Sequence, residues 1–352
     1  MLELKNISKT LGSFQLQNIS ITVEAHDYFV VVGASGAGKS QLLELIAGMS
    51  LPDSGSITLN GLDITQNKMQ KRDVGMVFQD YAIFPHMTVA QNIAYPLQYK
   101  NLSKSQINLK VKMLAEDMAI DHLLDRNPAE LSGGEQQRTA LARTLALDPK
   151  ILLLDEPLSN VDIRLKYELR RLLRKINKKG IPIVHVTHDF EDAIVLATKV
   201  AVIKDGRIIQ TGHPTEVFLH PASDFIAKFA GVRNFFRSEL IDETGSGLKL
   251  AMIKNHPGIH VVTDETPGEG SIIIPASDIF LSNQKTETSA RNQFKAQVCE
   301  VFPSLEGMEV IVDCGIKLAV LVSRSSVTEM NIVEGRDIWI SFKASSVQFI
   351  KG

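Results

Sequence analysis

The chain has 352 residues, of which 44% are hydrophobic and 22% charged, and its formal net charge is −2. This length allows two or more packed domains, and the even charge balance argues against a nucleic-acid-binding surface. Hydrophobic runs fall short of the roughly 18 to 20 residues that a membrane-spanning helix needs, and the first residues do not resemble a secretory signal. We therefore expect a soluble, cytoplasmic protein in which Cys299 and Cys314 are reduced core residues.

The first predicted site is a glycine-rich turn between an apolar run at residues 29–32 and a helical pattern that begins at Gln41. Such a turn predicts a phosphate-binding loop, because glycines let backbone N–H groups surround phosphate oxygens at a helix N-terminus. Lys39 is expected to bridge the β- and γ-phosphates, and the Ser40 hydroxyl to bind Mg²⁺. The predicted nucleotide-binding residues are Gly33, Ala34, Ser35, Gly36, Ala37, Gly38, Lys39, Ser40 and Gln41.

A second glycine pair lies in residues 131–138, which read Leu-Ser-Gly-Gly-Glu-Gln-Gln-Arg. Apolar residues continue beyond them at helical spacing, so Ser132 is expected to begin a helix. Its N-terminus predicts a second anion-binding site, and a capped structural helix is the alternative.

An apolar run at residues 151–154 ends in two acids, Asp155 and Glu156. Carboxylates are costly inside a sheet, so we expect them to face a ligand at the C-terminal end of this strand. Asp155 suits a Mg²⁺ site, and Glu156 suits the activation of a water molecule that attacks the γ-phosphate. Solvated acids at a strand end are the structural alternative.

In order and spacing, these motifs resemble those of the ATP-binding cassette ATPases. Residues 131–138 match the family's signature sequence, Gln79 its glutamine loop, Asp162 the loop after the acidic strand, and His188 its switch histidine. The resemblance covers residues 1 to about 230. It implies an α/β P-loop nucleotide-binding domain with a helical insert at about residues 88–150, and an ATP hydrolase coupled to transmembrane transport.

In that family, two domains enclose two ATP molecules head to tail, and each signature faces the phosphate loop of the other domain. One copy of each motif in this chain therefore implies a second copy of the chain as a partner. The resemblance assigns residues as follows: Glu156, His188 and Gln79 to catalysis; Ser40, Gln79 and Asp155 to Mg²⁺; Ser132, Gly133, Gly134 and Glu135 to the partner's nucleotide; and Asp162 to communication across the dimer.

The sequence departs from the family pattern in three places. Gln41 lies where a hydroxyl residue often contacts the α-phosphate. Leu11 lies where an aromatic ring commonly stacks on adenine, so either Phe14 makes that contact instead or the base is held weakly. Asn160 and Val161 precede Asp162 in a loop where small or leucine-containing variants are common.

Residues 81–88 resemble the surface on which importer ATPases receive a short helix of the membrane permease. Exposed aromatic and methionine side chains suit such an interface, and a place in an apolar core is the alternative for each of them. The resemblance implies two permease subunits as partners, an external substrate-binding protein as an indirect partner, and a peripheral position on the inner face of the cell membrane.

Beyond residue 231 the pattern changes to short strands separated by turn signals such as Glu269-Gly270, Glu306-Gly307 and Glu334-Gly335. We therefore expect an all-β C-terminal domain made of small oligomer-binding-type barrels at about residues 235–285 and 289–352. The predicted strands are residues 249–253, 260–263, 271–275, 294–302, 308–313, 317–323 and 337–342.

The segment at about residues 289–350 resembles the oxyanion-binding barrels of molybdate and tungstate importer ATPases and of small molybdenum-storage proteins. Serine hydroxyls, backbone N–H groups and a lysine suit a compact tetrahedral dianion. The predicted oxyanion-binding residues are Ser289, Arg291, Asn292, Ser325, Lys343 and Ser345. A purely structural barrel is the alternative.

The resemblance thus implies the ATPase subunit of a molybdate or tungstate importer, with a C-terminal domain that senses the oxyanion and restrains the ATPase. Two alternatives stay open. One is the same ATPase serving sulfate, sugar or polyamine import with a structural C-terminal domain. The other is an oxyanion-binding or storage regulator that does not drive transport.

Overall fold

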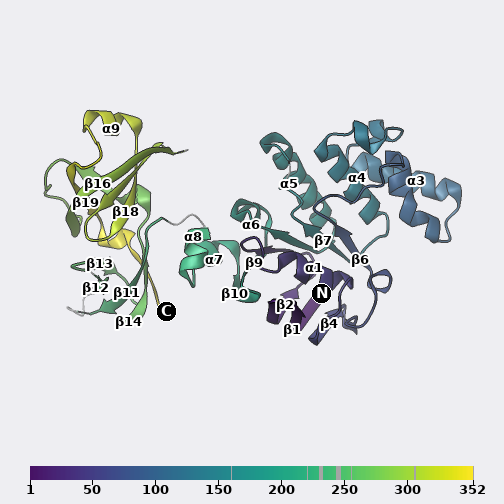
Figure 1. Cartoon of the computed structure of the whole chain (residues 1–352), viewed down its shortest axis with the longest axis horizontal. Helices are drawn as coiled ribbons and strands as arrows, with labels where there is room; N and C mark the ends of the chain where they lie inside the picture. Colours follow the sequence, from purple (N-terminus) through teal and green to yellow (C-terminus); the bar gives the residue numbers. More distant parts are fainter. Residues whose placement is uncertain are drawn as a thin grey trace. The chain divides into compact units, whose positions relative to one another are not determined.

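The computed structural model describes residues 1–159, 161–219, 221–229, 233–242, 247–254, 256–304 and 307–351. The chain divides into two compact units, Met1–Val217 and Phe218–Gly352 (Figure 1). The boundary predicted near residue 230, Asn160 and the break at Glu306 lie outside the described residues, and the predicted domain limits stay a prediction. Among the described residues, no helix has the length and apolar character needed to cross a membrane.

A six-stranded sheet with the order β10-β9-β3-β8-β7-β6 forms the centre of the first unit. Its strands are β3 (Tyr28–Val32), β6 (Val74–Val77), β7 (Ile151–Asp155), β8 (Ile183–Thr187), β9 (Lys199–Lys204) and β10 (Arg207–Gly212). All neighbours pair in parallel except β9 and β10, which pair antiparallel. The segments that follow β3, β6, β7 and β8 therefore meet at one edge of the sheet.

A second sheet, with the order β2-β1-β4-β5, packs over helix α1 (Lys39–Ala47). It contains β1 (Leu2–Leu11), β2 (Phe14–Val23), β4 (Ser54–Leu59) and β5 (Leu62–Asp63). The helix ends at Gly48, whose φ of 79° favours glycine. The buried Arg72 guanidinium then donates hydrogen bonds to the carbonyls of Leu45 and Ile46 at 2.6 and 3.0 Å. These bonds satisfy carbonyls that the helix end leaves open.

The helical insert contains α2 (Val89–Ala94), α3 (Lys104–Asp117) and α4 (Gly133–Leu145), and Figure 1 shows α3 and α4 side by side, away from the β1–β2–β4 sheet. Thr88, Ser103 and Ser132 cap these helices, each in a reciprocal capping box. Capping boxes satisfy the first free N–H groups and so fix where each helix begins. The other helices of this unit are α5 (Ile163–Lys178) and α6 (Phe190–Leu196), with 3₁₀ turns at Met69–Lys71, Tyr95–Tyr99, Asp121–Leu123 and Pro128–Glu130, and the unit ends within α7 (Pro214–Leu219).

In the second unit, α8 (Asp224–Phe229) is followed by two five-stranded antiparallel sheets, which confirms the predicted all-β C-terminal fold. Their orders are β13-β12-β11-β14-β20 and β15-β19-β16-β17-β18. The elements are β11 (Phe235–Ile241), β12 (Leu248–Met252), β13 (Ile259–Val262), β14 (Gly268–Ile273), β15 (Phe280–Ser282), β16 (Asn292–Ser304), β17 (Gly307–Asp313), β18 (Lys317–Val322), α9 (Arg324–Glu329), β19 (Asp337–Phe342) and β20 (Gln348–Lys351), with 3₁₀ turns at Ala276–Asp278 and Ala344–Ser346.

The pairing of these strands differs from two consecutive barrels. The last strand, β20, pairs with β14 of the first sheet, while β15 pairs with β19 of the second sheet. Each sheet therefore takes one strand from the sequence segment that forms the other, and one hydrophobic core contains residues of both.

One sequence expectation for this unit was wrong, and a second holds only in part. Gly270 was expected in a break between strands but lies inside β14, where an added Cβ would come within 2.4 Å of the Ile350 carbonyl oxygen. Glycine is needed at this position because β20 approaches the backbone closely, and not because the chain turns there. Cys299 and Cys314 are free, and both are only half-buried. Cys314 lies just beyond β17 and packs against the hydrophobic core, whereas Cys299 lies in β16 and is not among the residues of that core.

His185 is a fully buried histidine in β8, and its Nδ1 lies 3.1 Å from the Tyr28 hydroxyl. Burial lowers the pKa of His185 to about 3. As pH falls below about 6.5, the unfolded chain binds a proton here that the folded chain does not bind. The stability associated with neutral His185 is therefore complete above that pH and is lost progressively on acidification.

Replacing this histidine with glutamine, which does not titrate, is expected to remove that loss. Between about pH 7.5 and about pH 5.5, the unfolding free energy of the unchanged chain should fall by about 1.4 kcal/mol more than that of His185→Gln. Urea unfolding at both pH values measures the difference. Equal pH dependence in the two proteins would contradict this assignment.

Candidate functional site

The glycine-rich turn joins β3 to α1, as its sequence predicts. Gly36 and Gly38 have φ angles of 80° and 100°, which favour glycine. Gly38 is also crowded, since an added Cβ would lie 2.7 Å from the Phe14 ring. The turn therefore brings its backbone close to β2 and begins α1 at Lys39.

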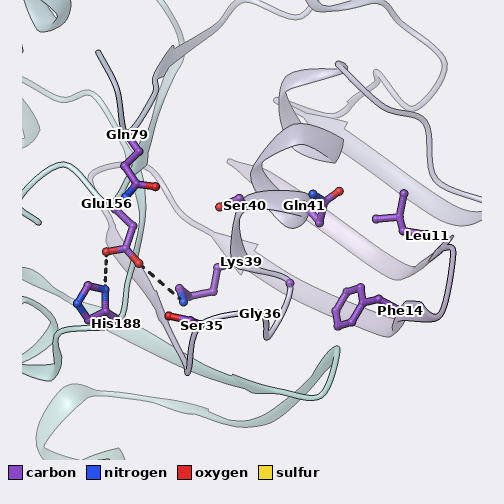
Figure 2. Close-up of a pocket in the computed structure, with 11 residues that line it drawn as sticks. Leu11, Phe14, Ser35, Gly36, Lys39, Ser40, Gln41, Gln79, Glu156 and His188 are labelled. Atoms are coloured by element: carbon purple, nitrogen blue, oxygen red, sulfur yellow. Dashed lines mark hydrogen bonds and ion pairs between the residues drawn. The ribbon is translucent and has the colours of Figure 1, made fainter. Parts of the chain in front are cut away.

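A cavity of about 590 Å³ opens at this edge of the sheet (Figure 2). It brings together residues that follow four different strands, together with Leu11 and the adenine candidate Phe14 of the N-terminal sheet. Its lining residues are Leu11, Phe14, Ser35, Gly36, Gly38, Lys39, Ser40, Gln41, Gln79, Glu156 and His188. Gly33, Ala34 and Ala37 belong to the same turn but are not among these lining residues.

Lys39 lies across the turn with its ammonium group held by the backbone. Its Nζ donates hydrogen bonds to the carbonyls of Gly33 at 2.9 Å and Ala34 at 3.1 Å. Burial lowers the pKa of Lys39, and the carboxylates of Glu156 and Asp155 oppose this effect. The lysine is thus preorganised beside the predicted phosphate position.

Glu156 follows the last residue of β7 and has a left-handed φ of 47°, an uncommon conformation for this residue type. Its Oε2 lies 2.6 Å from His188 Nδ1, and its Oε1 lies 3.8 Å from Lys39 Nζ. Figure 2 shows the carboxylate between these two groups. The Glu156 side chain is 12% exposed and that of His188 is 55% exposed, so the histidine is the more accessible partner.

Asp155 lies beside Ser40, whose hydroxyl donates a hydrogen bond to Oδ1 at 3.1 Å. Burial raises the pKa of Asp155. The hydroxyl, this carboxylate and the Gln79 carboxamide supply the hard oxygen donors that Mg²⁺ prefers. The residues predicted to hold Mg²⁺ therefore fit the ion by the chemistry of their donor atoms.

The predicted signature residues are not among the described residues that line the cavity at the phosphate loop of their own chain. Ser132 and Gly133 are exposed. Ser132 caps α4, while Glu135 accepts hydrogen bonds from the Ser132 N–H and hydroxyl, both at 2.8 Å. Gly134 is buried, and an added Cβ there would lie 2.2 Å from a Leu165 methyl group.

Asp162 caps α5 by accepting a hydrogen bond from the Leu165 N–H at 3.0 Å. Ser159 donates a hydrogen bond to the Glu156 carbonyl oxygen at 2.9 Å. The loop that carries Asp162 is thus bonded at one end to the backbone of Glu156 and at the other to helix α5.

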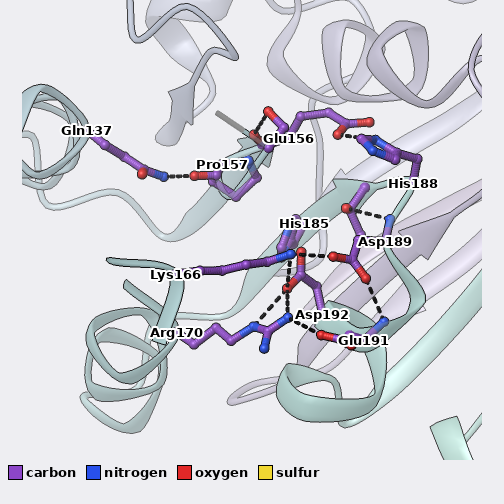
Figure 3. Close-up of polar contacts among 12 residues, drawn as sticks. Gln137, Glu156, Pro157, Lys166, Arg170, His185, His188, Asp189, Glu191 and Asp192 are labelled. Carbon is purple, nitrogen blue, oxygen red and sulfur yellow. Dashed lines mark hydrogen bonds and ion pairs between the residues drawn. The ribbon is translucent and has the colours of Figure 1, made fainter. Parts of the chain in front are cut away.

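Sequence reasoning missed Gln137, which links the signature helix to this loop. Its side chain is fully buried, and its Nε2 donates a hydrogen bond to the Pro157 carbonyl oxygen (Figure 3). The available signal was a polar residue on the helix face that also carries Ala140 and Leu141, where a core residue is expected.

The predicted oxyanion-binding residues have unequal environments. Asn292 is buried and already bonded on both sides, since it accepts from the His260 N–H at 2.8 Å and donates to the His260 carbonyl at 2.9 Å. Asn292 also pairs with Phe342, which places Lys343 at the end of the adjacent strand. The other predicted residues, Ser289, Arg291, Ser325, Lys343 and Ser345, are exposed.

A glycine-rich turn between a buried parallel strand and a helix, with acids and a histidine at the same sheet edge, defines a P-loop nucleotide-binding protein. A sequence model described as ABC transporter matches residues 16–159, and one described as TOBE domain matches residues 288–349. The chain belongs to the ABC transporter family of ATP-binding proteins. The resemblance drawn from the sequence motifs is thereby confirmed.

Several relatives match most of the chain. The molybdate/tungstate import ATP-binding protein of Pyrococcus abyssi is 39% identical over 352 residues, which cover 99% of both chains. That of Thermococcus kodakarensis is 41% identical over 85% of this chain and 88% of the relative. The sulfate/thiosulfate import ATP-binding protein of Thermosynechococcus vestitus is 43% identical over 68% of this chain and 72% of the relative.

Two solved structures resemble part of the chain. One is the cbiO1 protein of Clostridium perfringens, part of an ABC transporter complex, with a TM-score of 0.58 and 30% identity over 61% of this chain and 89% of that chain. The other is a dimeric ATP-binding cassette in a post-hydrolysis state with ADP and phosphate bound. Its TM-score is 0.55 and its identity 28%, over 61% of this chain and 99% of that chain.

Proposed function

We propose that this chain is the ATP-hydrolysing subunit of an importer of molybdate or tungstate. The observation that carries the proposal is a cavity where Lys39, Glu156 and His188 converge, in a chain similar over 99% of its length to molybdate/tungstate import proteins. The sulfate-related protein has comparable identity but matches only 68% of the chain. The match over 99% of both chains favours the molybdate or tungstate assignment.

In the proposed reaction, water attacks the γ-phosphate of ATP, and ADP and phosphate are the products. Glu156 orients this water and accepts its proton, Lys39 and the turn's N–H groups stabilise charge on the β- and γ-phosphates, and His188 contacts the γ-phosphate. Mg²⁺ bound by Ser40, Gln79 and Asp155 would neutralise phosphate charge. The position of Glu156 suits the orientation of this water, because its carboxylate lies between the Lys39 ammonium group and the His188 ring.

The exposed Ser132 and Gly133 fit a site shared between two copies of the chain. Their helix N-terminus attracts anions, and it lies outside the cavity of its own chain. The dimeric, ADP-bound relative supports the same arrangement. Ser132, Gly133, Gly134 and Glu135 would then contact the partner's ATP, while Asp162 would lie at the dimer interface.

The segment after Gln79 is the proposed contact with two permease subunits at the inner face of the cell membrane. Arg143 of α4 donates hydrogen bonds to the carbonyls of Ala82 at 2.7 Å and Tyr81 at 3.0 Å. Its guanidinium also lies 5.0 Å from the Phe84 ring centroid. This rigid support suits a surface that transmits movement from the nucleotide site to a partner.

The C-terminal unit is the proposed oxyanion sensor that restrains the ATPase. Exposed Ser289, Arg291, Ser325, Lys343 and Ser345 provide hydroxyl and cationic groups for a tetrahedral dianion. Because the Asn292 carboxamide is bonded to His260, its contribution would be to hold β16 beside β13. The external oxyanion-binding protein would act through the permease.

Substrate uptake by the source cells tests the proposed function. Deleting the gene that encodes this chain is expected to lower molybdate and tungstate uptake at least about tenfold. Sulfate and spermidine uptake should change less than about twofold. The unchanged chain should restore uptake, whereas Glu156→Gln should not. Loss of sulfate or spermidine uptake with normal molybdate uptake would reject the proposed substrate.

A further inference from the structure

We propose that a group of charged residues behind His188 positions this histidine and couples it to helix α5. The group, called here the switch ion-pair cluster, consists of Lys166 and Arg170 of α5 with Asp189 and Asp192 (Figure 3). The inference rests on the proposed function, because it takes His188 to contact the γ-phosphate.

The cluster is a continuous chain of ion pairs. Lys166 Nζ contacts the Asp189 carboxylate and lies 3.7 Å from Asp192 Oδ1. Arg170 donates from Nε at 2.9 Å and from Nη2 at 2.6 Å to the same Asp192 oxygen. The exposed Glu191 adds a contact with Arg170 Nη2 at 3.3 Å. Figure 3 shows the two cationic side chains extending from α5 toward the start of α6.

The positions of these residues join two elements of the proposed dimer interface. Lys166 and Arg170 are four residues apart and therefore lie on one face of α5, whose first turn is capped by Asp162. Asp189 directly follows His188 and caps α6 by accepting a hydrogen bond from the Glu191 N–H at 2.8 Å. The cluster thus connects the helix that begins at Asp162 to the segment that carries His188.

Burial makes this connection stiff. The side chain of Arg170 is 7% exposed and that of Asp192 is 2% exposed, so separating them would leave an unpaired buried charge. Burial alone would raise the pKa of Asp189, but hydrogen bonds from Lys166 and the backbone lower it. Both carboxylates therefore depend on cations from α5, and α5 and the start of α6 are expected to move together.

His188 is consequently held from two sides. Glu156 contacts its ring at 2.6 Å, and the cluster holds the backbone immediately after it through Asp189. A displacement of Asp162 by the partner chain would be carried along α5 to His188. This gives the cluster a positioning role that differs from contact with the nucleotide.

Lys166→Met tests this role, because methionine is an unbranched side chain only one atom shorter than lysine and carries no charge. We expect kcat for ATP hydrolysis to fall about tenfold with KM within about twofold of the unchanged chain. The affinity for a non-hydrolysable ATP analogue relative to ADP should fall about fivefold. Lys166→Arg should stay within about twofold in both measurements, as should the control Lys178→Met at an exposed site on the same helix.

A double-mutant cycle with His188→Ala separates positioning from general stability. In the His188→Ala background, Lys166→Met should change the analogue-to-ADP affinity ratio by less than about twofold. The inference would be overturned if Lys166→Met lowered the analogue-to-ADP affinity ratio equally with and without His188→Ala. It would also be overturned if Lys166→Met weakened the binding of the analogue and of ADP equally. Asp189→Asn, which keeps an N-capping residue for α6, provides a second variant if Lys166→Met does not fold.

The cycle also distinguishes this inference from the proposed function. If His188→Ala leaves the affinity ratio unchanged, the cluster cannot act through His188 and the inference is wrong. Loss of hydrolysis in Glu156→Gln would still support the ATPase assignment in that case. Retention of hydrolysis in Glu156→Gln would instead contradict the proposed function itself.

Discussion

Glu156→Gln is expected to lower kcat for ATP hydrolysis by about 10² to 10³-fold, while ATP affinity changes less than about threefold. Glutamine has nearly the same size and retains an oxygen near His188, but it cannot accept a proton from the attacking water. Because Lys39 and the glycine-rich turn are unchanged, the phosphates keep their binding groups. Phosphate release measures hydrolysis, and equilibrium binding of a fluorescent ATP analogue measures affinity.

The control for this prediction is the same chemical change at an exposed position. Glu116 of α3 is exposed and pairs only loosely with Lys112, at 3.9 Å. Glu116→Gln should therefore leave both measurements within about twofold of the unchanged chain. Hydrolysis by Glu156→Gln that stays within about tenfold of the unchanged chain would remove Glu156 from the proposed role of base.

The sequence predicts the composition of the cavity because its motifs are local and the sheet is parallel. Gln79, Glu156 and His188 come soon after β6, β7 and β8, and parallel strands bring those ends to one edge. The pattern does not predict the backbone of Glu156. The strand ends at Asp155, and the left-handed φ at Glu156 depends on the loop that continues through Ser159.

The switch ion-pair cluster was not predictable in the same way. Charged residues on a helix usually form a solvated face, so Lys166 and Arg170 carried no signal of burial. Their partners lie 22 and 23 residues away in the sequence, at positions that only the packing of α5 against α6 brings together. The pairing is a tertiary property that single-residue patterns do not contain.

The C-terminal unit illustrates the same limit for strands. Short strand patterns between turn signals predicted most of its strands, but β20 pairs with β14 across more than 70 residues of sequence. Such long-range pairing depends on the closure of the whole core, whereas local patterns determine only where strands form. Gly270 shows the consequence, since its close approach to β20 was mistaken for a break.

An equimolar mixture of two inactive variants, Lys39→Met and Ser132→Asp, is expected to regain ATPase activity. In a shared site, the first variant supplies an intact signature and the second an intact phosphate loop. About half of randomly formed dimers would be mixed, and each would hold one complete site, giving about a quarter of the unchanged rate if sites act independently. Each variant alone should retain less than about one hundredth of the ATPase rate of the unchanged chain.

The two substitutions change the nucleotide contacts while preserving local structure. Methionine fills the space of the Lys39 side chain but has no charge to offer the phosphates. Aspartate at position 132 keeps the N-cap of α4 and places a negative charge toward the partner's γ-phosphate. Ser132→Thr, which retains a hydroxyl and the cap, should stay active. A mixture that shows only the sum of the two single-variant rates would mean that no site is shared, since mixed dimers provide the only route to a complete pairing of loop and signature.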